Sequence, residues 1–194
     1  MLILASQSAS RRMMLDAVGL AYRALPAHLD ERALEAALGD APPADVALAL
    51  AEAKALAVSR EHPDALVLGS DSLVDVAGRR FDKPADRAEA AGHLRHFSGK
   101  VMHLHSAAAL ARDGKIEWSG GAVAALHVAE LSDAFIEDYL AQEWPAVAGC
   151  VGVFRIEARG PLLFEAIEGD QFTVLGLPLL SVLAALRRLG ELPS

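Results

Sequence analysis

The chain is poor in cysteine, aromatic residues and basic residues. Its one cysteine, Cys150, excludes an internal disulfide and a zinc site built from several cysteines. Aromatic residues make up 5% of the 194 residues and hydrophobic residues 53%, which is typical of a folded domain with an aliphatic core. Eighteen basic residues against 26 acidic ones give a net charge of −8. This balance argues against binding to a nucleic acid polymer or an anionic membrane, because both need a basic field.

Long hydrophobic runs are also missing. The longest uncharged stretch, residues 171–186, is interrupted by Gly176 and Pro178 and is shorter than the roughly 20 apolar residues of a membrane helix. The apolar start Leu2–Ala5 is too short for a signal sequence, and its arginines follow it instead of preceding it. We therefore expect a cytoplasmic protein with no membrane partner and a single domain over residues 1–194.

Short apolar runs and helical patterns share the chain without strict alternation, which predicts an α/β fold with a mixed sheet. The expected strands are residues 2–5, 65–69, 101–110 and 116–128, with a hairpin over 74–81. The expected helices include residues 45–60, 86–97, 132–142 and 178–189.

A serine-rich turn with two arginines lies between the first expected strand and the helix after it. Ser8 or Ser10 can cap that helix, and Ser6 precedes them. Arg11 and Arg12 occupy the first turn, where each cation costs about 0.3–1 kcal/mol unless an anion is bound. The arrangement predicts a cradle for a triphosphate, although no P-loop pattern is present. The alternative is a capped helix with two solvated arginines.

A second group of polar residues follows the apolar run 65–69. Asp71 is expected at the carboxyl end of that strand, where α/β folds place their ligands. Lys83, one of only four lysines, lies across the expected hairpin. The pair could hold a metal ion and a phosphate, respectively. The alternative is a salt bridge at the sheet edge.

Other candidates are weaker when taken alone. Glu31 could supply a second metal carboxylate, while its neighbour Asp30 is expected to cap a helix. Lys54 fits a solvated charge pair with Glu52 on the long helix. Glu157 shows no functional pattern of its own.

Six motifs, in order along residues 2–189, resemble the Maf family of nucleoside triphosphate pyrophosphatases. In one of them, Asp82 stands where the family has glycine. The motifs are Leu4-Ala5-Ser6-x-Ser8-x-x-Arg11-Arg12, Leu29-Asp30-Glu31, Ala53-Lys54-Ala55, Gly69-Ser70-Asp71-Ser72, Asp82-Lys83-Pro84 and Leu175-Gly176-Leu177-Pro178.

The resemblance implies a two-lobed α/β fold, with helices flanking a mixed sheet and a central cleft, as in the inosine triphosphate pyrophosphatases. It implies cytoplasmic, metal-dependent hydrolysis of a nucleoside triphosphate to a monophosphate and pyrophosphate, and a homodimer. Asp71 would be the base and, with Glu31, would bind Mg²⁺ or Mn²⁺. Lys54 and the catalytic Lys83 would neutralise the departing pyrophosphate.

The substrate contacts follow from the same motifs. The phosphate oxygens would be held by Ser6, Ser8, Arg11 and Arg12. Ser10, Ser72 and Glu157 align with the base-selecting positions of the family. Glu157 resembles the branch that acts on 7-methylguanosine triphosphate, while Ser10 and Ser72 match neither that branch nor the dTTP and UTP branch. The base preference is therefore open between the two.

The alternative function is a nucleotide-binding regulator that does not hydrolyse its ligand and is linked to cell division. Asp71 and Lys83 argue against it, because a pure sensor needs neither a base nor a leaving-group cation.

Overall fold

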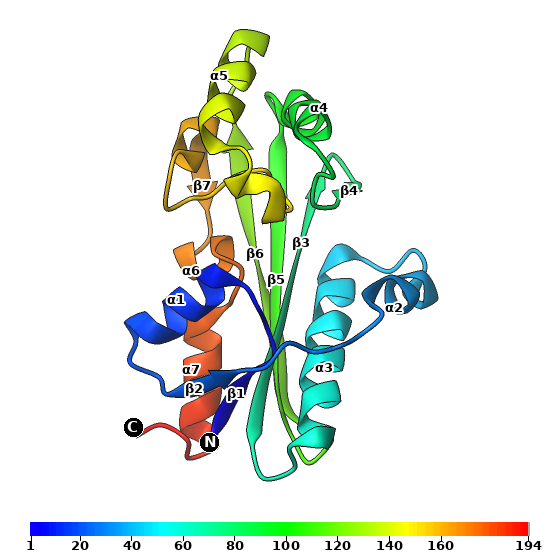
Figure 1. Cartoon of the computed structure of the whole chain (residues 1–194), viewed down its shortest axis with the longest axis vertical. Coiled ribbons are helices and arrows are strands. Elements are labelled where there is room, and N and C mark those ends of the chain that lie inside the picture. Colours follow the sequence, from blue (N-terminus) through cyan, green and yellow to red (C-terminus); the bar gives the residue numbers. More distant parts are fainter. Residues whose placement is uncertain (194) are drawn as a thin grey trace. The chain divides into compact units, whose positions relative to one another are not determined.

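The computed structural model describes residues 1–193 as two compact units (Figure 1). Unit 1 contains Met1–Ser72, His105–Ala122 and residues 171–193, and unit 2 contains Leu73–Leu104 and Val123–Asp170. The strands are β1 (Leu2–Leu4), β2 (Tyr22–Ala24), β3 (Leu66–Val76), β4 (Arg79–Phe81), β5 (Val101–Arg112), β6 (Lys115–Val128) and β7 (Phe164–Glu168). The α-helices are α1 (Ala9–Ala17), α2 (Glu31–Leu38), α3 (Pro43–Glu61), α4 (Arg87–Phe97), α5 (Asp133–Glu143), α6 (Gln171–Val174) and α7 (Leu179–Arg188).

The sheet is mixed, as predicted. Within residues 1–193 its seven strands follow the order β2-β1-β3-β5-β6-β7, with β4 paired to β3. Strand β1 runs parallel to both β2 and β3, whereas the β3–β4 and β6–β7 pairs are antiparallel. The chain is therefore a mixed α/β protein. Strands β3, β5 and β6 each contribute residues to both units.

In unit 1, alternate residues of β1 and β3 pack against different helices. Leu66 and Leu68 belong to a buried cluster with residues of α1 and α7. Ala65 and Val67 belong to a second cluster with Val58 of α3. Because successive side chains of a strand point to opposite faces, helices cover both faces of these strands.

The contact between α3 and β3 is unusually close. A Cβ atom on Gly69 would lie 2.2 Å from the Ala51 carbonyl oxygen and 2.6 Å from the Ala55 nitrogen. Helix α3 therefore rests on strand backbone at a point where only glycine leaves room. This approach brings the side chains that follow Ala51 on the helix close to those that follow Gly69 on the strand.

In unit 2, α4 packs against α5 and against β4. Phe81 of β4 meets Phe97 of α4 edge-on, with ring centroids 4.8 Å apart. Two short 3-10 helices, η1 (Ala146–Gly149) and η2 (Gly160–Leu163), lie between α5 and β7. Tyr139 of α5 is fully buried and donates a hydrogen bond to the Val153 carbonyl oxygen at 3.1 Å.

Most of the predicted elements are confirmed, with one correction that bears on function. The strand predicted over residues 65–69 continues to Val76, so Asp71 lies within β3 and not beyond its end. Strands β2 and β7 and helix α6 are short and were not among the predicted elements. The central cleft, and a single domain over residues 1–194, stay predictions. Among residues 1–193, no helix combines the length and hydropathy that crossing a bilayer requires.

Candidate active site

Three of the predicted residues of unit 1 form one charged cluster. Lys54 Nζ lies 2.6 Å from Asp71 Oδ1 and 3.0 Å from Glu31 Oε2. The side chains of Lys54 and Asp71 are each 12% exposed, whereas that of Glu31 is 45% exposed. An ammonium between two carboxylates in a partly desolvated place is a strong electrostatic arrangement. The cluster therefore carries one net negative charge at the position of the predicted base.

Local sequence explains how each member reaches the cluster. Asp30 caps α2, accepting a hydrogen bond from the Ala33 nitrogen at 3.0 Å, and Glu31 is the first residue of that helix. Lys54 stands next to Ala55, at the close contact with Gly69, and Asp71 follows two residues after that glycine. Lys54 is thus not half of a solvated pair with Glu52, whose carboxylate accepts a hydrogen bond from Ser119.

A second cluster is built around Arg11, which is 8% exposed. Its Nε donates to the Gly176 carbonyl oxygen at 2.8 Å, and Nη1 donates to Ser6 Oγ at 3.2 Å and to the Ser70 carbonyl oxygen at 2.9 Å. Nη2 donates to Ser72 Oγ at 3.1 Å. Burial lowers the pKa of the Arg11 guanidinium, and the negative charges of Asp71 and Glu31 oppose that shift. The guanidinium nevertheless stays protonated at neutral pH.

Three serines complete this second cluster: the predicted Ser72, and Ser70 and Ser106, to which no role was assigned from the sequence. Ser70 is fully buried and donates to the carbonyl oxygens of Ala107 at 2.8 Å and Gly176 at 3.2 Å. Ser72 Oγ donates to the Gly176 carbonyl oxygen at 3.1 Å. Ser106 Oγ lies 3.1 Å from Ser72 Oγ. Two serines spaced two positions apart, Ser70 and Ser72, are the only signal in the sequence for this cluster. Their hydrogen-bond partners lie far away in the chain and could not be predicted from it.

The N-terminus of α1 has the predicted cap. Ser8 Oγ accepts a hydrogen bond from the Arg11 nitrogen at 3.4 Å and lies 2.9 Å from Ser10 Oγ. The Ser8 nitrogen in turn donates to Ser6 Oγ at 3.2 Å. The first turn of α1 contains no acidic residue. Its free N–H groups and positive partial charge are therefore not compensated by an acidic side chain of that turn.

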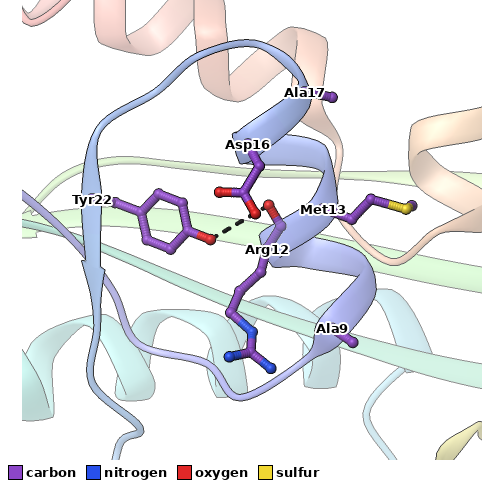
Figure 2. Close-up of a pocket in the computed structure, with 6 residues that line it drawn as sticks. All are labelled: Ala9, Arg12, Met13, Asp16, Ala17 and Tyr22. Atoms are coloured by element: carbon purple, nitrogen blue, oxygen red, sulfur yellow. Dashed lines mark hydrogen bonds between the residues drawn. The ribbon is translucent and has the colours of Figure 1, made fainter.

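Arg12 lies apart from Arg11, on the exposed side of α1. Figure 2 shows it lining a shallow surface pocket with Met13, Asp16 and Tyr22, together with Ala9 and Ala17. The Tyr22 hydroxyl donates to the Arg12 carbonyl oxygen at 3.4 Å, which ties the edge strand β2 to the helix. The two adjacent arginines therefore have different surroundings, one inside the protein and one facing solvent.

The two remaining predicted residues, Lys83 and Glu157, belong to unit 2, and both are exposed. Burial raises the pKa of the Cys150 thiol, and the charge of Glu157 acts in the same direction. The charges of Arg155 and Lys83 lower it. Within unit 2, Cys150 is therefore within electrostatic range of both predicted residues.

The segment that carries Glu157 is held by a buried acid. Arg155 Nε and Nη2 donate to Glu143 Oε2 at 3.0 and 2.9 Å, and Glu143 is 3% exposed. Gly160 is required at the end of this turn, because a Cβ there would lie 2.4 Å from the Arg155 carbonyl oxygen. Glu157 thus stands on a turn with a fixed backbone, two residues after the anchored Arg155.

The residues that could hold a divalent cation are Glu31 and Asp71. Both carboxylates already reach the same ammonium group, so both can reach one small cation in its vicinity. Carboxylate oxygens are the ligands that Mg²⁺ and Mn²⁺ prefer, and such sites often take further ligands from substrate phosphates. Within residues 1–193, no group of three or more His, Cys, Asp or Glu side chains is arranged to bind a metal by itself.

A buried aspartate held by a lysine, in the same unit as a serine-capped helix N-terminus, defines a candidate site for a phosphate-bearing ligand. Residues 1–189 match the family described as Maf-like protein. The chain belongs to this family, as its motifs predict.

Curated relatives extend over the whole chain. A 7-methyl-GTP pyrophosphatase of Rhizobium meliloti (strain 1021) is 48% identical over 194 residues, covering 99% of this chain and 98% of that protein. A nucleoside triphosphate pyrophosphatase of Rhodopseudomonas palustris (strain BisB18) is 46% identical over 187 residues, covering 96% and 93%. Both names denote hydrolases of phosphoanhydride bonds, so the enzyme class predicted from the sequence is confirmed.

A solved HAM1 protein of Coxiella burnetii aligns over 94% of this chain and 97% of that chain, with 16% identity and a TM-score of 0.49.

Proposed function

We propose that the protein hydrolyses a nucleoside triphosphate at the α-phosphorus, releasing a nucleoside monophosphate and pyrophosphate. The single observation that supports it most is the bridge from Lys54 to Asp71 and Glu31. It places a carboxylate that can take a proton from water beside a cation that can stabilise negative charge on the phosphates. A module that only bound nucleotides would need the cation but not the second and third members of this cluster.

The phosphate chain needs positive charge more than covalent chemistry. In unit 1 we assign this work to Lys54, to the exposed Arg12 and to the N-terminus of α1 with Ser8 and Ser6. Lys83 of unit 2 is proposed as the further catalytic cation on the basis of its motif. Asp71 is the proposed general base, and it directs a water molecule toward the α-phosphorus.

The proposed metal ligands are Glu31 and Asp71. A bound Mg²⁺ or Mn²⁺ ion would supply Lewis-acid stabilisation of the charge on the phosphate oxygens. The protein's own part is to hold the two carboxylates within reach of one cation. Lys54 contributes by holding both of them toward the same point.

We propose that the preferred nucleobase is 7-methylguanine, so that the preferred substrate is 7-methylguanosine triphosphate. The relative from Rhizobium meliloti is named for this substrate, and so is one from Mesorhizobium japonicum that is 48% identical over 193 residues. Glu157 can accept two N–H hydrogen bonds from a guanine edge, which a uracil ring does not offer in the same pattern. Ser10 and Ser72 are proposed as lesser contributors to base selection.

A panel of triphosphates tests the proposal: 7-methyl-GTP, GTP, UTP and dTTP, each with Mg²⁺ and with Mn²⁺. We expect pyrophosphate and the monophosphate as products, fastest with 7-methyl-GTP. Orthophosphate and a diphosphate would instead identify a phosphatase. Tight binding of a triphosphate without turnover would favour the regulator linked to cell division. The cytoplasmic location and the homodimer stay predictions, and size-exclusion chromatography with light scattering tests the dimer.

A further inference from the structure

Arg11 stands behind the proposed base. Leu66 and Leu68 of β3 pack toward α1 and α7, whereas Val67 of β3 and Ala65, just before it, pack toward α3. Because side chains alternate along a strand, Ser70 and Ser72 continue the first set and Asp71 continues the second. Their contacts agree, since Arg11 of α1 binds at Ser70 and Ser72 while Lys54 of α3 binds Asp71. The guanidinium and the carboxylate therefore act on opposite faces of the same strand.

The hydrogen bonds of Arg11 leave little capacity for a ligand. A guanidinium has five N–H donors, and Arg11 spends four of them on protein oxygens. Two of these oxygens, the Ser70 carbonyl and Ser72 Oγ, belong to the residues immediately before and after Asp71. The strand is thus clamped on both sides of the base by one planar, rigid group.

The Gly176 carbonyl oxygen is the fixed point of this clamp. It accepts from Arg11 Nε at 2.8 Å, from Ser70 Oγ at 3.2 Å and from Ser72 Oγ at 3.1 Å. Gly176 has φ of +94°, and a Cβ there would lie 3.1 Å from Ser72 Oγ. A glycine in this conformation lets the backbone turn its carbonyl toward the serines without a side chain between them.

We propose that Arg11, acting through Ser70, Ser72 and the Gly176 carbonyl, is a positioning residue for Asp71 and not a ligand of the phosphate chain. The inference rests on the proposed function, because it assumes that Asp71 is the base. It separates two neighbouring arginines of one motif: Arg12 contributes to substrate binding, and Arg11 to the placement of the base.

Kinetics of the full-length protein distinguish the two roles. Arg11→Lys keeps the charge but cannot reproduce the planar fork, so kcat should fall about 10- to 100-fold, as is typical when a supporting partner of a functional ligand is lost. KM for 7-methyl-GTP should stay within about threefold, because the change is not at the binding surface. Arg12→Lys should raise KM more than it lowers kcat. Arg112→Lys is the matched control: Arg112 also holds two carboxylates, Glu117 and Glu191, and both constants should be unchanged.

A second variant covers the case in which Arg11→Lys does not fold. Ser70→Ala removes one donor to Gly176 and leaves the arginine in place, so kcat should again fall with little change in KM. An Arg11→Lys or Ser70→Ala protein whose KM rises at least tenfold at unchanged kcat overturns the inference, since that is the behaviour of a direct phosphate ligand.

Amide NMR spectra of the free protein give a readout that does not depend on activity. The Asp71 and Lys54 amide resonances should move in Arg11→Lys and stay in place in Arg112→Lys. If they stay in place in both, Arg11 does not position the base. Absence of turnover in the unsubstituted protein would refute the proposed function, and the spectra would still decide whether Arg11 holds Asp71.

Discussion

Lys54 Nζ and Asp71 Oδ1 are 2.6 Å apart, and each of the two side chains is only 12% exposed to solvent. The ammonium also contacts Glu31, so it stands where two carboxylates would otherwise repel each other. A divalent cation placed between the same carboxylates would do the same electrostatic work. Removing the lysine should therefore make the protein more dependent on metal for its stability.

Thermal unfolding of Lys54→Met tests this relationship. Without metal the variant should lose about 1–3 kcal/mol, because the mostly buried Asp71 carboxylate loses a charged hydrogen-bond partner. Adding Mn²⁺ should raise the melting temperature of Lys54→Met more than that of the unsubstituted protein. The exposed Lys115→Met serves as the control. An equal effect of Mn²⁺ on all three proteins would mean that Glu31 and Asp71 do not share a cation.

Asp71→Asn should abolish turnover while leaving the fold in place. Loss of a general base lowers the rate by about 10²- to 10⁴-fold. The fold should persist because Lys54 keeps Glu31 as a partner at 3.0 Å. Asp64→Asn, in the exposed turn before β3, should have normal activity. Steady-state release of pyrophosphate measures both variants, and near-normal turnover in Asp71→Asn would refute its role as base.

Gly69→Ala should be strongly destabilising. The added methyl group would lie 2.2 Å from the Ala51 carbonyl oxygen, so α3 must move away from β3. Such overpacking costs about 1–3 kcal/mol, and sometimes more. Gly92→Ala is the comparison, because this helical glycine has open space around it and alanine there should stabilise by about 0.5–1 kcal/mol. Urea midpoints for the two variants should shift in opposite directions, and a shift of the same sign in both would contradict the packing argument.

Protonation of His93 should destabilise unit 2. The ring lies 5.0 Å from that of Phe81, its residue is 8% exposed, and its Nδ1 has no hydrogen-bond partner within residues 1–193. Burial lowers the pKa of His93 below its ordinary value of 6.5, and Arg79 and His96 act in the same direction, while Glu89 and Asp82 oppose the shift. The unfolded chain therefore binds a proton more readily than the folded one. The contribution of His93 to stability is complete above pH 6.5 and decreases as the pH falls below that value.

Unfolding free energies of His93→Leu and of the unsubstituted protein, measured between about pH 5 and pH 8, test this dependence. The difference between the two should favour the variant increasingly toward acid pH. His28→Leu, at an exposed position, should show no such trend. A pH-independent difference for His93→Leu would show that this histidine does not titrate in the range.

Glu157→Gln should reduce the preference for 7-methyl-GTP over UTP. A carboxylate can accept both N–H groups of a guanine edge, whereas an amide presents one oxygen and one NH₂ group. We expect the ratio of the two kcat/KM values to fall by about tenfold or more, the value of one charged hydrogen bond. Glu61→Gln, at an exposed end of α3, is the control. An unchanged ratio would remove Glu157 from the set of base-selecting residues.

Local patterns in the sequence were sufficient for much of the fold. The caps Ser8 and Asp30 accept the expected backbone hydrogen bonds, and the strands predicted over residues 101–110 and 116–128 are present as β5 and β6. Each of these features depends on a few neighbouring residues, so composition and spacing predict them. Strands β2 and β7 were missed because three to five mostly exposed residues leave no hydrophobic period to detect.

The site was harder to predict, because its contacts join distant segments. Ser70, Asp71 and Ser72 suggest the end of a strand, and it is Arg11 and Lys54 that let the strand continue through them. Arg11 reaches Gly176, 165 positions away in the sequence, and no local pattern indicates such a partner. The motif names Arg11 and Arg12 alike, and it could not separate the buried arginine from the exposed one.

The two ends of the sheet order, β2 and β7, offer little unpaired backbone. Strand β2 has three residues and carries Arg23, and β7 has five and carries Glu165 and Glu168. Short, charged edge strands are poor templates for a strand from another molecule. Strand addition from another molecule is therefore disfavoured at β2 and at β7, and fibril growth should not begin from either of them.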